Sequence, residues 1–123
     1  MITAQELNPK GYATTPEQDA NLAVLLEKMN KIRAAYGKPM YITSGLRSEE
    51  DQARINPKVT ASKHEQCAAV DIGDPDREFG HWCLMHLDYL IELDLYMEDP
   101  SHTPTWIHLQ CIGPKSGKRI FIP

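Results

Sequence analysis

The chain has 123 residues, of which 41% are hydrophobic and 24% are charged, and its formal net charge is −4 at pH 7. This length fits a single domain, so we expect residues 1–123 to fold around one core. The acidic balance argues against nucleic acid as a partner, since nucleic-acid binders usually carry a basic patch, and no stretch approaches the roughly 20 apolar residues that span a bilayer.

The N-terminal residues and the cysteines indicate where the protein is made. Residues 1–7 have neither a basic start nor an apolar run, so no secretory signal is predicted. Three cysteines without C-x-x-C spacing favour a reducing compartment over a disulfide framework. We expect synthesis in the cytoplasm, so action outside the membrane would need release by another factor. Cys67 or Cys111 could ligate a metal, although a small buried apolar role is commoner for a free cysteine.

The first long element is a predicted helix with signals at both ends. Thr15 can cap it, Pro16 suits the first helical position, and Gln18 can complete a capping box. Apolar residues then recur at spacings of three and four as far as Tyr36, and Gly37 is a stop signal. We expect this helix to support a sheet and to carry no chemistry.

Residues 39–43 predict a strand that leads into the turn Ser44-Gly45-Leu46-Arg47-Ser48, and residues 48–55 predict a short helix after it. Arg47 is the candidate functional residue of this turn, because its guanidinium fork can bind a carboxylate through two parallel hydrogen bonds. A surface ion pair with one of the acids at positions 49–51 is the simpler interpretation, and from the residues alone it is favoured.

The next segment, SKHEQCAAVD at positions 62–71, places an imidazole and a carboxylate seven positions apart. A turn between His64 and Asp71 would set the two side chains opposite one another on adjacent strands. Alternation along the second strand directs Val70 and Ile72 to the core, and Ala69 and Asp71 to the other face.

The rest of the chain predicts one helix and three strands. A nearly continuous apolar pattern predicts a single helix that begins at position 75 or 76 and runs to about position 94. The predicted strands are 95–97, 105–111 and 119–122, and we expect the last two to pair as a hairpin. Alternation within 105–111 places Trp106, His108 and Gln110 on one face, which makes Trp106 and Gln110 candidate pocket residues beside His108.

His64, Asp71 and His108 together offer two imidazoles and one carboxylate. That is a ligand set for a catalytic zinc ion, whose fourth position must stay open for water or substrate. Taken singly, His64 is more simply a surface residue and Asp71 a turn or helix-cap residue. The combination favours one shared zinc site, and Ser62 could hydrogen-bond one of its ligands.

Three segments, in this order along the chain, resemble the M15 peptidase group, which contains the zinc D,D-peptidases and Hedgehog-type metallopeptidases. Ser62, His64, Ala69 and Asp71 fit the signature S-x-H-x-x-G-x-A-x-D of that group. The turn at 44–48 is similar to its S-G-x-R-S segment, and residues 106–108 are similar to its second zinc segment. Two positions depart from the pattern: Cys67 stands at the signature glycine, and Thr105 stands where many members carry an acid three positions before the second histidine.

The resemblance implies an α+β fold of the Hedgehog and D,D-peptidase kind, with a small central antiparallel sheet and helices packed on one face. It implies that Zn²⁺ is held by His64, Asp71 and His108. It also reverses the preference at Arg47, which becomes the residue that anchors a substrate carboxylate or the oxyanion. Ser44, in the same turn, is then expected to contact substrate.

A zinc peptidase also needs a carboxylate near the metal to accept a proton from water. Thr105 cannot do this, so we expect the base to be Glu98 or Asp99, at the end of the predicted strand 95–97. Glu98 is preferred for its longer reach, and Glu65 is a distant third. The simpler interpretation makes both Glu98 and Asp99 ordinary turn residues.

We therefore expect a zinc metallopeptidase that hydrolyses peptide bonds in the stem peptides of bacterial cell walls, as a D,D-carboxypeptidase or an L-alanyl-D-glutamate endopeptidase. The small size and the missing signal resemble phage-associated single-domain members, and we expect a monomer whose partner is the peptidoglycan peptide. The alternative is an inactive zinc-binding module with a structural or partner-binding role, which the threonine at position 105 favours. A third reading is an α+β domain without metal.

Overall fold

The computed structural model describes residues 2–45 and 68–122, and the chain has the predicted α+β class. Its elements in chain order are α1 (Ala4–Leu7), α2 (Pro16–Tyr36), β1 (Ile42–Ser44), β2 (Ala69–Gly73), α4 (Glu78–Met85), α5 (Leu87–Glu92), β3 (Tyr96–Glu98), the 3-10 helix η1 (Pro100–His102), β4 (Trp106–Gln110) and β5 (Ile120–Phe121). The predicted helix over 48–55 lies outside the described residues.

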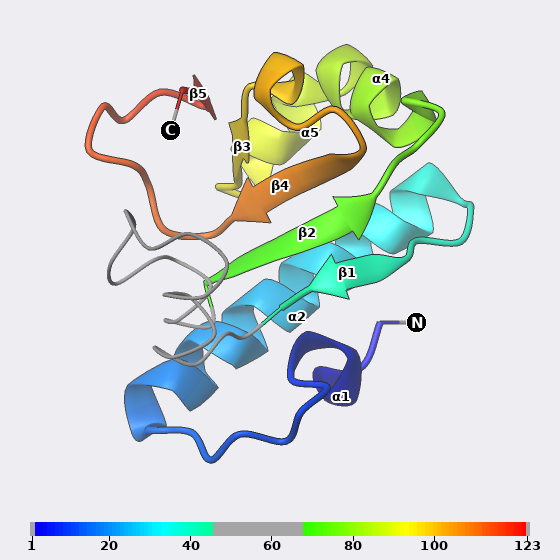
Figure 1. The fold of residues 1–123 in the computed structure, drawn as a ribbon. Coiled ribbons are helices and arrows are strands. Elements are labelled where there is room, and N and C mark those ends of the chain that lie inside the picture. The colour runs from blue at the N-terminus through cyan, green and yellow to red at the C-terminus, as the bar shows by residue number, and fades with distance from the viewer. Residues whose placement is uncertain (1, 46–67, 123) are drawn as a thin grey trace.

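The strands form one five-stranded sheet in the order β1-β2-β4-β3-β5 (Figure 1). All pairs are antiparallel except β3 and β5, which run parallel. The expectation that the last strand pairs with β4 as a hairpin is therefore wrong. The reason is that β2 and β3 occupy both edges of β4, so the C-terminal strand pairs with the outer edge of β3. Hydrogen bonds from Met97 N to Arg119 O and from Asp99 N to Phe121 O, both 2.7 Å, hold it there.

The signals read at both ends of the long helix are confirmed in α2. The Thr15 hydroxyl accepts from the Gln18 amide, and the Gln18 side chain accepts from the Thr15 amide, which completes the capping box. At the other end Gly37 takes the left-handed conformation, with φ 73°, that ends many helices. Both ends were predictable because capping chemistry is local.

The helix predicted from position 75 or 76 to position 94 is divided into α4 and α5 at His86. The backbone of His86 leaves the helical region, with φ −121° and ψ 33°, and its ring Nδ1 lies 2.8 Å from Trp82 O. Each half directs its own apolar side chains inward, Phe79 and Cys83 from α4 and Leu90 from α5. The apolar pattern is continuous across the break, so periodicity alone could not locate it.

Helices cover one face of the sheet, as predicted. Figure 1 shows α2 passing behind β1 and β2, and α5 behind β3 and β4. The buried side chains between them come from both layers: Leu25, Met29, Ile32, Val70, Ile72, Phe79, Leu90, Met97, Ile107 and Leu109. The opposite face of β2 and β4 carries Asp71 and His108. Among the described helices, none is both long and apolar enough to cross a membrane.

Candidate metal centre

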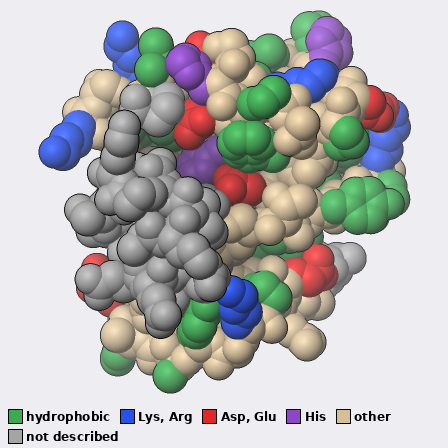
Figure 2. Space-filling view, in the orientation of Figure 1, with side chains coloured by type: hydrophobic (Ala, Val, Ile, Leu, Met, Phe, Trp, Pro, Cys, Tyr) green, Lys and Arg blue, Asp and Glu red, His purple; other side chains and the backbone are tan. Residues whose placement is uncertain are grey.

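A row of side chains crosses the sheet face opposite the helices, at right angles to the strands. Antiparallel pairing sets Ser44 beside Asp71 and Asp71 beside His108. The β3–β4 register continues the row to Glu98, and β5 adds Phe121 beside Glu98. Opposed residues of neighbouring strands share a face, so the row takes one residue from each of the five strands. Figure 2 shows the result as histidine surface lying against acidic surface near the centre of this face.

Asp71 and His108 form the central contact of the row. They are 37 positions apart in the chain, yet His108 Nδ1 lies 2.9 Å from Asp71 Oδ1. Their side chains are only 12% and 10% exposed, respectively. Burial opposes charging of the ring, but the hydrogen bond to Asp71 and the negative charges of Asp71 and Glu98 outweigh it and raise the pKa of His108. The pocket therefore favours a positive charge between these two groups.

The second ring nitrogen of His108 is also engaged. Its Nε2 lies 2.7 Å from Gln110 Oε1, and the Gln110 amide nitrogen donates to Ile112 O at 2.7 Å. Gln110 was expected to line the substrate pocket, on the same face as His108. The structure places it on that face but buries it to 4% exposure, with both ends of its amide occupied.

The two candidate bases differ in what their carboxylates do. Asp99 accepts hydrogen bonds from the backbone amide and the hydroxyl of Ser101 at the start of η1, and these bonds lower the pKa of Asp99. Glu98 sits in the row beside His108, where burial raises its pKa, the positive charge of His108 opposes that rise and the negative charge of Asp71 adds to it. Of the two, only Glu98 interacts electrostatically with both members of the central contact.

The remaining expected pocket residues in the described ranges lie around this row. Ser44 pairs with Asp71 in the register of β1 and β2. Trp106 is half-buried and pairs with Gly73, two positions along the strands from the Asp71–His108 pair.

Three expected site residues, Arg47, Ser62 and His64, lie outside the described residues, as does Cys67. Within residues 2–45 and 68–122, no group of three His, Cys, Asp or Glu side chains could hold a metal ion. Cys111, the other cysteine considered as a ligand, packs against the core cluster and so faces away from His108. The described part of the chain therefore supplies two of the three expected ligands.

The donor atoms of Asp71 and His108 fit a tetrahedral ion. Zinc bonds of about 2.0–2.2 Å place two ligand atoms of a tetrahedron about 3.4 Å apart. The observed 2.9 Å between Nδ1 and Oδ1 needs only a small opening to reach that separation. A carboxylate oxygen and an imidazole nitrogen are also both normal zinc ligands, and only one more protein ligand is needed to leave a position open.

Two residues near the site carried no recognisable signal in the sequence. The guanidinium of Arg77 donates to two carbonyls of the connection between β3 and β4, those of Pro100 at 3.0 Å and Thr103 at 2.6 Å, and to the carbonyl of Trp106 at the start of β4, at 3.4 Å. Phe121 places its ring edge-on to His108, with centroids 6.1 Å apart. A single arginine after a turn and a phenylalanine in a short terminal strand are too common to be singled out.

Comparison with known proteins supports the resemblance. The model of the Peptidase M15 family matches residues 1–86. The matched region contains Asp71 and ends before Glu98 and His108. Searches of curated proteins and of solved structures found no match.

Proposed function

The chain belongs to the peptidase M15 family, and from that premise we propose that it is a zinc-dependent peptidase acting on the stem peptides of bacterial cell walls. The family supports peptidase activity in general, whereas zinc and the cell-wall substrate are parts of the proposal. The bond cleaved is that of a D,D-carboxypeptidase or of an L-alanyl-D-glutamate endopeptidase, two activities that release different products.

The observation that carries the proposal is the contact between Asp71 and His108. A carboxylate oxygen and a ring nitrogen from two distant parts of the chain meet at 2.9 Å in a largely buried place. Buried ionisable groups are costly unless paired or bound to a metal, so this arrangement is expected where a cation is held. His64, which precedes the β2 strand in the signature, is proposed as the third ligand.

The other residues have complementary roles. A bound zinc ion would supply Lewis-acid polarisation of the peptide carbonyl and lower the pKa of water. Glu98 accepts the proton of the attacking water and passes it to the leaving amine, because it lies beside His108 whereas the carboxylate of Asp99 is engaged by Ser101. Arg47 binds a substrate carboxylate or the developing oxyanion, Ser44 and Trp106 contact the peptide, and Ser62 hydrogen-bonds a ligand.

The competing function is a zinc-binding module without activity. Thr105 supports this alternative, because many members of the group carry an acid at that position, three residues before the second histidine. The position of Glu98 supports the active enzyme over this alternative, since strand β3 brings a carboxylate close to His108.

The test is release of peptides from purified cell wall, measured with the zinc content of the same samples. We expect about one equivalent of zinc, release that stops with a chelator, and a rate lowered about 10²–10⁴-fold in Glu98→Gln with zinc retained. Asp99→Asn is the matched control, one position away and engaged in a cap, and should change the rate less than about threefold by the same principle. Bound zinc without release by any variant would favour the inactive module, and absence of zinc would reject both.

A further inference from the structure

A string of hydrogen bonds from Ile112 to His108 determines which ring nitrogen carries the proton. The Ile112 carbonyl oxygen can only accept, so the Gln110 atom 2.7 Å away must be the NH₂ end of the amide. The Gln110 oxygen must then face His108 Nε2, at 2.7 Å. Because that oxygen also only accepts, Nε2 must donate and therefore carries a hydrogen.

The consequence falls on the other ring nitrogen. A neutral imidazole has one N–H, so Nδ1 keeps its lone pair when Nε2 is the donor. That lone pair points at a second acceptor, Asp71 Oδ1, at 2.9 Å. Two acceptors that face one another need a cation between them, which is either a proton or a metal ion.

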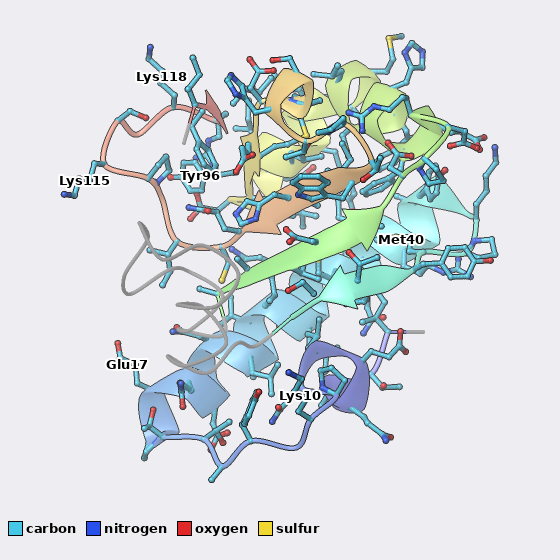
Figure 3. All side chains as sticks on the ribbon, in the orientation of Figure 1. Lys10, Glu17, Met40, Tyr96, Lys115 and Lys118 are labelled. Atoms are coloured by element: carbon cyan, nitrogen blue, oxygen red, sulfur yellow. The ribbon has the colours of Figure 1, made fainter. Side chains whose placement is uncertain are left out.

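The backbone next to the Ile112 carbonyl is held in place by Tyr96. A Cβ added at Gly113 would lie 3.1 Å from the Tyr96 ring, so this backbone is packed directly against the ring. The Arg119 guanidinium lies 4.2 Å from the centroid of the same ring and also donates to Leu95 O at 3.2 Å. Figure 3 shows Tyr96 beside the loop that carries Lys115 and Lys118.

We propose that Gln110 is a positioning residue that fixes His108 as the Nε2–H tautomer and presents Nδ1 to the metal. This inference rests on the proposed function, because the orientation of the His108 ring matters only if His108 binds zinc. Outer hydrogen-bond partners of this kind orient metal-binding histidines and strengthen them as ligands. Gln110 is thereby a residue of the C-terminal part of the sheet that acts through His108 and not on the substrate.

The experiment compares tautomer and zinc affinity in three variants of the full chain. Long-range ¹H–¹⁵N NMR of the zinc-loaded protein, in which no proton lies between Nδ1 and Asp71, distinguishes the protonated ring nitrogen from the one that binds the metal. Zinc affinity is measured by competition with a chromogenic chelator. Gln110→Met removes both amide ends at similar length, Gln110→Glu keeps an acceptor for Nε2–H, and Gln5→Met, on the exposed side of α1, is the matched control.

We expect the Nε2–H tautomer in wild type, in Gln110→Glu and in the control. Gln110→Met should mix the two tautomers and lose about 10–100-fold in zinc affinity, while Gln110→Glu stays within about threefold of wild type. An Nδ1–H tautomer in wild type, or Gln110→Met with unchanged tautomer and affinity, would overturn the inference. If wild type binds no zinc, the proposed function fails; an Nε2 resonance that then moves in Gln110→Met but not in Gln110→Glu or the control still supports the orienting role of Gln110, and an unmoved one overturns it. If Gln110→Met does not fold, the wild-type spectrum and Gln110→Glu still decide.

Discussion

Replacing Asp74 with alanine is expected to destabilise the protein strongly without altering the metal centre. Asp74 is 2% exposed, and its two carboxylate oxygens accept from the amides of Phe79 at 2.9 Å and Gly80 at 2.8 Å, in the first turn of α4. These are amides that have no partner inside the helix, and the negative charge lies at the positive end of the helix dipole.

The magnitude follows from these two bonds. A hydrogen bond to a charged group contributes about 1.5–3 kcal/mol, and a buried amide left without an acceptor adds its desolvation penalty. We take the lower end of the sum, about 3 kcal/mol, because water can partly rehydrate an opened helix end. For a chain of this length that corresponds to a fall in Tm of about 10 °C. The Asp74 amide still donates to Thr105 O at 2.8 Å after the substitution, so β2 and β4 should keep their register.

Urea denaturation of Asp74→Ala and of Asp76→Ala tests this reasoning. Asp76 is the matched control because it is exposed and accepts only one amide of the same turn, from Glu78 at 3.1 Å. Its removal should cost less than about 1 kcal/mol, within the range for exposed caps. Zinc affinity below the transition should stay within about twofold in both variants. Equal losses of stability in the two variants would refute the argument from burial.

Three further predictions concern the surroundings of the site. Arg77→Ala should lower the free energy of unfolding, measured in urea, by about 2 kcal/mol, because the hydrogen bonds to the backbone carbonyls are lost. Arg77→Gly should lower it by about 1 kcal/mol less, because residue 77 has φ 65°, a conformation that glycine tolerates better than alanine. Equal losses in the two variants would contradict this account. The bonds from Ser101 lower the pKa of Asp99, so its contribution to stability is present above the unfolded pKa of about 3.9 and is lost as the pH falls through the folded value. The stability difference between wild type and Asp99→Ala should therefore shrink below about pH 4 in urea titrations, and a difference that grows there would reject the role of the cap. Burial raises the pKa of Cys83, so mass spectrometry after labelling with a thiol reagent should find Cys83 unmodified until the protein unfolds, in contrast to the partly exposed Cys111.

Local signals in the chain were sufficient for several features. The ends of α2 follow from Thr15, Gln18 and Gly37, whose effects act over three or four residues. Alternation along β4 was enough to place His108 and Gln110 on one face and Ile107 and Leu109 in the core. The motifs were enough to indicate the family. Arg47, Ser62 and His64 remain predictions from the motifs, because the structure does not describe them.

Other features depended on which strands pair, and this is decided by packing between segments far apart in the chain. Glu98 and Asp99 were nearly equal candidates by sequence, and only the register of β3 sets Glu98 beside His108 while η1 engages Asp99. The partner of β5 also depended on which sheet edge remained available.

For Gln110, one property followed from the sequence and another only from the tertiary structure. Its face of the sheet followed from a period of two, which is a property of any strand. Its contacts with His108 and Ile112 followed from the segment after β4, which packs at Gly113 against Tyr96 of another strand. The sequence by itself determined which residues could serve the site, because residue type and period are local; the tertiary structure decided which of them do, because hydrogen-bond partners are set by distances across the sheet.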